Sequence, residues 1–267
     1  NILLLDKQTG KVEWQHALEK GEECNAVALT RKGEILYSYK RGAKLVTWDH
    51  QVVWDYKTPD KTELQSATLL QNGGVLLGIC GVPAQFIELD KKGKEVNKVT
   101  LNLEVERPHS QFRQVFQLRN SHYLIPVMAK QKVLEVSRKG KIIAEHQIEG
   151  KAFSSLELPD ENLLLPCGDN HCYIVIDRKT GEELKRVNAL DIEGVALLFV
   201  GQILQLKNGN LLICNWYGHT KDTTVDEPQL IEIDKNGKVV WSLHDKKNVG
   251  KISAACYIDN FRLPDLK

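Results

Sequence analysis

The chain has 267 residues and a formal net charge of +1, with 42% hydrophobic and 27% charged residues, the balance of an ordinary globular protein. Its 36 Lys and Arg residues are offset by 35 Asp and Glu residues, which argues against a nucleic-acid binder, because that class needs an uncompensated basic face. No apolar run approaches the roughly 20 residues that span a bilayer, so a membrane-spanning segment is excluded.

One phrase recurs six times along the chain: an alternating apolar strand, usually an acidic residue, a turn that usually contains Gly, and a second strand that often ends in Trp. The alternation has the period of a strand with one buried face. Gly at the turn supplies the positive φ of a tight hairpin, so each phrase predicts a β-hairpin. The phrases occupy residues 2–14, 45–54, 86–96, 133–143, 173–184 and 230–241.

A second pair of strands with its own turn lies between consecutive phrases, for example over residues 65–79 and 201–216. Two hairpins in each repeat make a four-stranded antiparallel unit, and a repeat of about 40–45 residues is typical of a propeller blade. Stretches with the period of a helix are nearly absent. The sequence therefore predicts an all-β chain, a six-bladed β-propeller that forms one domain over residues 1–267.

We expect the ring to close between the N- and C-terminal strands. The first phrase has no strand pair before it, and the last is followed by a single predicted strand over residues 251–259. Pairing of this strand with the first hairpin would hide edges that otherwise recruit other chains. The closing blade is thus predicted from residues 1–21 and 251–267. Residues 261–267 contain a Pro and make a poor second strand, so we expect that the chain begins inside a blade.

The residues with the most distinctive chemistry fall in loops that a propeller places on one face, around the mouth of its axial channel. We therefore predict a ligand-binding site there. It consists of Arg107, His109, Gln111, Arg113, Asp169, His171, Asp191, Glu193, Trp216 and His219.

Aligned repeats place small or polar residues at one position of each inner strand, where a buried strand would take Val or Ile. A hydrated channel explains them, and so does crowding at the axis, although crowding fits two glutamines badly. These positions are Ala26, Ser66, Gln114, Ser154, Gln202 and Ser253.

Three segments suggest chemistry, and each has a structural alternative. Arg107 and Arg113 could bind a carboxylate, sulfate or sulfated sugar, with His109 as acid, base or nucleophile. Alternatively, the segment that contains them could be a salt-bridged loop. Asp169 and His171 could face the channel mouth or cap their own turn.

In the insertion at residues 215–228, Trp216 could be exposed and stack against a sugar or an aromatic ring of a ligand. Alternatively, the Trp216 side chain could pack beneath the insertion.

Six cysteines are scattered along the chain, and only Cys167 and Cys172 are close in sequence. A zinc site would add His171, but the spacing matches no common zinc finger. A disulfide and two reduced thiols both remain open. We expect no metal and no cofactor.

The Asp-x-x-x-Gly-x-x-x-Trp-type phrases and the Leu-x-x-Gly-x-x-Leu inner hairpins resemble those of six-bladed propellers of uncharacterised function in the bacterial quinoprotein-like and arylsulfotransferase-like superfamily. The resemblance covers essentially all residues. Residues 106–114, 167–172, 186–195 and 214–219 also resemble extracytoplasmic propellers of Gram-negative bacteria, which implies a periplasmic or extracellular location. Quinoprotein dehydrogenases have eight blades, so a six-bladed ring argues against pyrroloquinoline quinone.

We expect a monomeric, ligand-binding propeller that recognises a glycan, a small anion or a partner at the channel mouth. The alternative is an enzyme resembling arylsulfotransferases or propeller lyases, with His109 or His171 as nucleophile or base and arginines that stabilise an anionic transition state. Two or more of His109, His171 and His219 around an arginine in a deep pocket would favour chemistry. A shallow mouth with an exposed Trp216 would favour binding.

Overall fold

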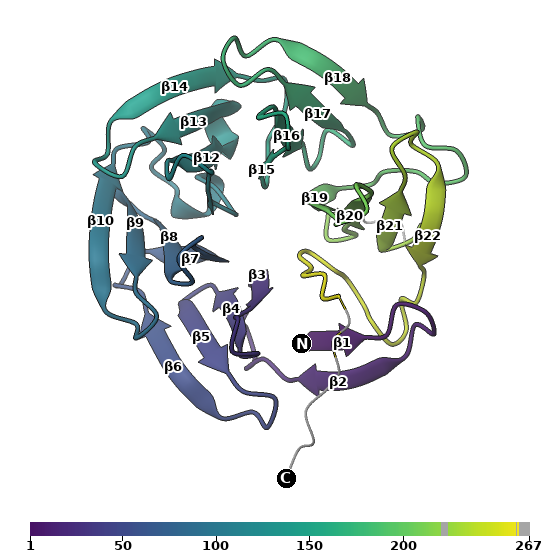
Figure 1. Cartoon of the computed structure of the whole chain (residues 1–267), viewed down its shortest axis with the longest axis horizontal. Coiled ribbons are helices and arrows are strands. Elements are labelled where there is room, and N and C mark those ends of the chain that lie inside the picture. Colours follow the sequence, from purple (N-terminus) through teal and green to yellow (C-terminus); the bar gives the residue numbers. More distant parts are fainter. Residues whose placement is uncertain (220–223, 260, 262–267) are drawn as a thin grey trace.

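The computed structural model describes residues 1–219, 224–259 and 261. It is an all-β propeller in which four-stranded antiparallel sheets are arranged as blades around a central axis (Figure 1). The lowest-numbered strand of each blade lies nearest the axis and the highest-numbered strand lies at the rim. The middle strands are buried on both faces between neighbouring blades, which explains their nearly continuous apolar sequence.

The strand bounds follow the chain order. The first blade contains β3 (Cys24–Leu29), β4 (Ile35–Tyr39), β5 (Gly42–Val46) and β6 (Val52–Lys57). The second contains β7 (Glu63–Leu69), β8 (Val75–Cys80), β9 (Ala84–Leu89) and β10 (Glu95–Leu101). The third contains β11 (Phe116–Gln117), β12 (Tyr123–Val127), β13 (Lys132–Val136) and β14 (Ile142–Gln147). The fourth contains β15 (Leu156–Glu157), β16 (Leu163–Pro166), β17 (Tyr173–Ile176) and β18 (Glu183–Val187). The fifth contains β19 (Val200–Gln205), β20 (Leu211–Asn215), β21 (Leu230–Ile233) and β22 (Val239–Leu243), and two 3₁₀ turns, η1 (Pro108–Ser110) and η2 (Met128–Lys130), lie beside the third blade.

The prediction of six blades was wrong, because the described residues form five four-stranded sheets. β1 (Ile2–Leu5) and β2 (Val12–His16) form a separate two-stranded sheet. Residues 251–259 run on the axial side of β1 (Figure 1) but form no strand. Hydrogen bonds that involve side chains hold them instead: Ser253 Oγ donates to the Cys24 carbonyl at 2.8 Å, and the Ala255 N–H donates to Gln202 Oε1 at 2.8 Å. Residues 260 and 262–267 of the predicted closing blade lie outside the described residues.

The acidic residue of the repeated phrase closes the outer hairpin of its blade. Asp90 Oδ1 accepts the N–H groups of Lys94 and Lys92 at 3.0 and 2.8 Å, and these backbone hydrogen bonds lower the pKa of Asp90. Gly93 follows in the same turn with φ of 79°, a conformation that glycine adopts without steric cost. The phrase is therefore a hairpin device of the individual blade.

A second feature of the repeat joins neighbouring sheets at three junctions of the ring. A buried Glu two positions before the hairpin residue pairs with a basic residue that directly follows the hairpin residue of the next repeat. The pair of Glu232 with Lys7 connects the last blade to the two-stranded sheet. At the same junction, Trp241 Nε1 donates to the Lys7 carbonyl at 2.9 Å. The pairs are Glu88–Arg138, Glu135–Arg178 and Glu232–Lys7.

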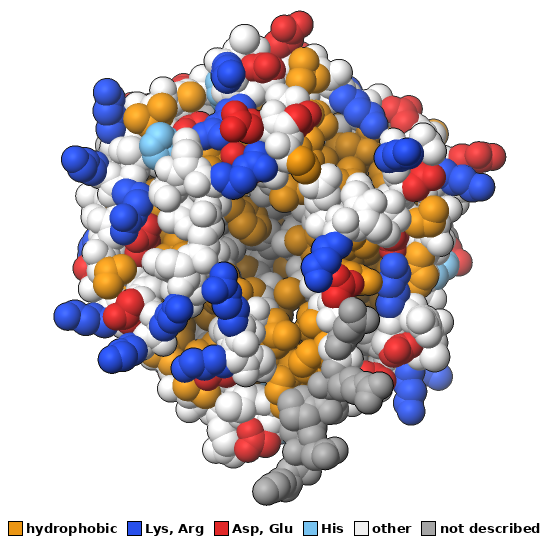
Figure 2. Space-filling model, viewed as in Figure 1, with side chains coloured by type: hydrophobic (Ala, Val, Ile, Leu, Met, Phe, Trp, Pro, Cys, Tyr) orange, Lys and Arg blue, Asp and Glu red, His pale blue; other side chains and the backbone are white. Residues whose placement is uncertain are grey.

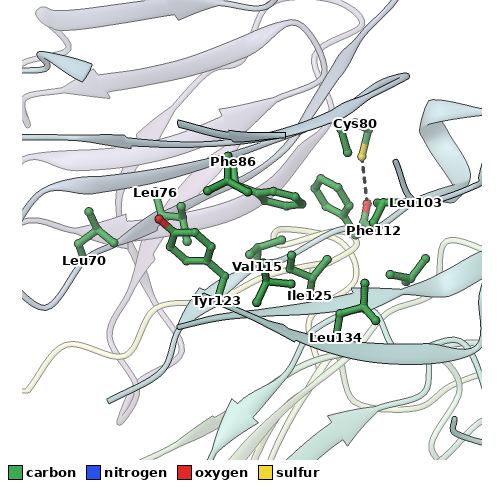
Figure 3. Packing of buried hydrophobic residues seen from close by; sticks show 14 residues of the cluster. Leu70, Leu76, Cys80, Phe86, Leu103, Phe112, Val115, Tyr123, Ile125 and Leu134 are labelled. Atoms are coloured by element: carbon green, nitrogen blue, oxygen red, sulfur yellow. Dashed lines mark hydrogen bonds between the residues drawn. The ribbon is translucent and has the colours of Figure 1, made fainter. Parts of the chain in front are cut away.

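The hydrophobic core lies between adjacent blades. In the cluster shared by the second and third blades, the rings of Phe86 and Phe112 lie 5.3 Å apart and Tyr123 faces them (Figure 3). Cys80 Sγ donates to the Phe112 carbonyl at 3.6 Å in the same cluster. This packing fixes where the segment before β11 meets the axis, and that segment carries Arg113.

Candidate functional site

A small pocket, about 40 Å³ in volume, opens on the axis at the ends where the inner strands begin. Residues from four blades and from the C-terminal segment line it, so the ring brings together parts of the chain that are far apart in sequence. Four of the ten predicted site residues belong to this lining. The lining consists of Glu23, Asn25, His109, Arg113, Gln114, Phe153, Phe199, Gly201, Trp216, His219 and Ser253.

Arg113 is the central charged group of the pocket, and it is only 6% exposed. Its Nη1 donates to the carbonyls of His109 and Phe112 at 2.7 and 3.0 Å, and its Nη2 lies 3.0 Å from His109 Nε2. Within the described part of the chain, no carboxylate forms an ion pair with this guanidinium. Desolvation lowers the pKa of Arg113, because burial disfavours the charged form. The pocket thus contains a buried cation whose hydrogen-bond partners are all neutral.

His109 is held in one tautomer between Arg113 and Glu63. A guanidinium can only donate hydrogen bonds, so His109 Nε2 must be the acceptor and Nδ1 carries the proton. Nδ1 then donates to Glu63 Oε2 at 2.9 Å. Burial opposes ionisation of Glu63, but hydrogen bonds from His109 and Gln65 outweigh it and lower the pKa of Glu63. The lone pair of His109 is therefore occupied by Arg113.

A chain of amides continues from Glu63 around the mouth. Gln65 Nε2 donates to Glu63, Asn25 Nδ2 donates to Gln65 Oε1, and Gln114 Nε2 donates to the Asn25 carbonyl, at 2.7, 2.7 and 2.8 Å. Gln114 is 3% exposed, yet its Oε1 has no partner among the described residues. Glu63 and Gln65 were not among the predicted site residues. Their i, i+2 spacing on β7, which puts both on one face, was the available signal.

The other side of the pocket is an aromatic wall formed by Phe153, Phe199, Trp216 and His219. Phe199 contacts Phe153, Trp216 and His219 edge to face, with centroid distances of 4.5, 5.0 and 5.1 Å. The Arg113 guanidinium lies over the Phe153 ring at 5.2 Å. Phe153 and Phe199 were not among the predicted site residues. Phe153 occupies the repeat position of Asn25, Gln65 and Arg113, directly before the predicted channel position, and that register would have revealed it.

Two glycines make room for the aromatic wall. A Cβ at Gly218 would lie 1.6 Å from the Trp216 ring, and a Cβ at Gly168 would lie 2.9 Å from the Phe199 ring. Neither distance is compatible with a side chain, so the chain needs glycine at both positions for these rings to pack as they do.

The remaining predicted residues lie outside the pocket lining. Asp169 is beside it, with Oδ1 2.7 Å from His219 Nδ1. The Gln111 amide is buried and bonds to Gly81 and Val105. Asp191 accepts hydrogen bonds from Asn188, and His171 Nδ1 contacts the Leu198 carbonyl. Arg107 and Glu193 are exposed.

The opposite end of the inner strands surrounds a wider cavity of about 510 Å³. Its lining is mainly Ala, Val, Leu and other apolar side chains, together with residues 255–259. On the face of the molecule shown in Figure 2, hydrophobic side chains surround the central hollow. Lys207 pairs with Asp259 at 2.8 Å beside this cavity. Gln114 lines both cavities and therefore lies between them. Apart from Gln114, the groups of the first pocket do not reach this cavity.

All six cysteines, including Cys167 and Cys172, are free thiols in the structure. Over residues 1–219, 224–259 and 261, no three His, Cys, Asp or Glu side chains are grouped to hold a metal ion. No helix within the same ranges is long and apolar enough to cross a membrane.

Comparisons with known proteins agree with the fold. A crystal structure of a protein of unknown function from Bacteroides caccae has 42% sequence identity and a TM-score of 0.92, covering 95% of this chain and 93% of that one. A catalytically inactive virginiamycin B lyase from Staphylococcus aureus with quinupristin has 15% identity and a TM-score of 0.63, covering 91% and 77%. A streptogramin B lyase has 12% identity and a TM-score of 0.65, covering 95% and 78%.

Of the expected resemblance, these comparisons show the β-propeller fold and its similarity to lyase propellers. A comparison with curated proteins finds no match. The family model described as Mal s 1 allergenic protein-like matches residues 1–238, which is most of the sequence. The chain therefore belongs to the Mal s 1 allergenic protein-like family.

Proposed function

We propose that the pocket at the channel mouth binds a small organic anion. The anionic group pairs with Arg113, and an apolar or planar part of the ligand lies against Phe199 and Trp216. The observation that carries this proposal is the burial of the Arg113 guanidinium with hydrogen-bond partners that are all neutral. Of the three ligand classes predicted from the sequence, a small anion fits this group best.

The energetics of a buried charge support an anionic ligand. A buried guanidinium without a counter-ion has an unfavourable desolvation free energy. A carboxylate or similar group offsets it through short, charge-assisted hydrogen bonds. Glu63 does not supply this charge, because His109 at 2.9 Å and Lys40 at 3.3 Å already engage its oxygens. The ligand supplies the missing counter-ion.

The experiment is a calorimetric titration with benzoate, phenyl phosphate and neutral benzamide. We expect the anions to bind and benzamide not to bind. Arg113→Met weakens anion binding by about 10- to 100-fold, the value of a hydrogen bond to a charged group.

The matched control is Arg107→Met, which removes an exposed arginine outside the pocket lining and leaves affinity unchanged. Anion binding that survives Arg113→Met, or no anion binding by the unaltered protein, would contradict the proposal.

A lyase is the second candidate, and the Asp169–His219 pair favours it. Asp169 orients the ring through Nδ1 at 2.7 Å, which leaves Nε2 of a pocket-lining histidine as a base for removing a proton from a ligand. His109 is less suited, because Arg113 occupies its lone pair. Conversion of quinupristin by the protein but not by His219→Ala, followed by mass spectrometry, would support this candidate.

We also propose that the ring closes between the last blade and the β1–β2 sheet, through the contacts of Lys7 with Glu232 and Trp241. The monomeric state and the extracytoplasmic location remain predictions from the sequence.

A further inference from the structure

The pocket that contains Arg113 also contains one free acidic group. Glu23 lines it from the segment before β3. The side chain is exposed, and no cation within the described ranges pairs with it. Its neighbour Glu22 differs, because Lys44 binds the Glu22 carboxylate at 3.3 Å. One unpaired positive and one unpaired negative group thus face the same small space.

We infer that the ligand is zwitterionic, an α-amino acid whose carboxylate pairs with Arg113, whose ammonium group faces Glu23 and whose apolar side chain lies against Phe199 and Trp216. This inference rests on the proposed anion site and names its ligand class. An α-amino acid carries both charges on one carbon, which suits two opposite charges in one narrow pocket.

Glu23 is the better partner for an ammonium group than Asp169. Asp169 does not line the pocket, and its Oδ1 is engaged by His219 at 2.7 Å. The polar atoms that remain on the axial side are neutral. They include Gln114 Oε1, which is buried without a partner in the described structure and can accept a further ammonium hydrogen.

The size of the pocket restricts recognition to the head group. A volume of about 40 Å³ has room for about three waters. The amino and carboxylate groups fill that space, and the side chain projects towards the aromatic wall at the rim. Trp216 is half-buried there and His219 is exposed. The site therefore favours apolar and aromatic amino acids over acidic ones, since Glu23 and Asp169 repel a second negative charge.

The test uses L-phenylalanine, N-acetyl-L-phenylalanine, which lacks the ammonium charge, and L-phenylalaninamide, which lacks the carboxylate. Titration calorimetry of the whole chain is expected to give the tightest binding for L-phenylalanine. Glu23→Gln weakens L-phenylalanine about fivefold, the upper value for an exposed ion pair, and leaves N-acetyl-L-phenylalanine unchanged. Arg113→Met weakens both carboxylates.

Glu193→Gln is the matched control, because it removes an exposed carboxylate outside the pocket lining and leaves every affinity unchanged. Circular dichroism of Glu23→Gln is expected to match the unaltered protein, since Glu23 is exposed and forms no ion pair with any residue that the structure describes. Equal affinity for L-phenylalanine and its N-acetyl derivative, with no effect of Glu23→Gln, overturns the zwitterion inference but keeps the anion site. Binding of neither, or binding that is indifferent to Arg113→Met, overturns the anion site as well.

Discussion

Replacing Arg178 with methionine is expected to lower the free energy of unfolding by about 3–5 kcal/mol, the cost of leaving a buried charge without its partner. Arg178 binds Glu135 of the preceding blade in bidentate fashion, with both N–O distances at 2.8 Å. The Glu135 side chain is 7% exposed. Burial opposes its ionisation, but hydrogen bonds from Arg178 and His122 outweigh burial and lower the pKa of Glu135 to about 2. Without Arg178, the carboxylate remains between two blades.

Urea unfolding followed by circular dichroism measures this effect. Arg41→Met is the matched control, because Arg41 pairs with a fully solvated Asp60, and it should change stability by less than about 1 kcal/mol. Adding Glu135→Leu to Arg178→Met should restore part of the loss, because it removes the buried Glu135 charge, whereas Glu157, which Arg178 binds at 2.9 Å, still lacks this partner. Equal effects of the two arginine substitutions would show that the pair between the blades does not stabilise the ring.

Replacing Asn215 with alanine is the second large effect, about 3 kcal/mol of destabilisation together with weaker ligand binding. Asn215 is fully buried at the end of β20. Its Oδ1 accepts the Leu198 N–H at 2.7 Å, and its Nδ2 donates to the carbonyls of Ala196 and Pro228 at 2.9 and 3.2 Å. Alanine removes the partner of all three backbone groups, which are buried or partly buried. Because Leu198 directly precedes Phe199, the aromatic wall loses its support.

Thermal unfolding and titration with benzoate measure the two consequences separately. Asn236→Ala serves as the control and should change stability by no more than about 0.5 kcal/mol, since the exposed Asn236 side chain has a single long hydrogen bond within the described structure, to Asp234 at 3.5 Å. If Asn215→Ala loses stability but keeps full affinity, the loop that carries Phe199 does not support the site.

The sequence predicted the four-stranded blades because strand period, hairpin turns and repeat length all act locally. The prediction of a sixth blade was wrong, because a segment becomes a strand only where its backbone forms hydrogen bonds with a neighbouring strand. In residues 251–259, Ser253 Oγ and the Ala255 N–H make contacts that replace such pairing. The residue types of that segment are compatible with either outcome.

The sequence also contains the pattern that predicts the ion pairs between blades, but the more regular acidic residue at the hairpin turn is easier to recognise. Asp90 and Asp234 mark the turn of the hairpin. The residue two positions earlier, Glu88 or Glu232, is the one that binds the next repeat. Each partner lies one repeat away, so only a comparison of repeats in ring order reveals the pair.

Four of the eleven residues that line the pocket followed from residue chemistry alone. His109, Arg113, Trp216 and His219 were predicted because their functional groups are distinctive. Phe199 was missed because an apolar residue next to a strand suggests core packing. Gln111 was predicted to bind ligand because it lies in the same loop as His109 and Arg113. Its amide is instead buried and bonds to the Gly81 backbone, a contact that depends on tertiary packing and is not evident from the sequence.

A crystal structure of the protein with 4-iodobenzoate tests the central claim most directly, because the iodine can be located by its anomalous scattering. The account predicts the carboxylate in hydrogen-bonding contact with Arg113 and the iodine against Phe199 or Trp216. Iodine only in the wide apolar cavity beside Lys207 and Asp259, or an empty pocket at saturating ligand, would contradict it.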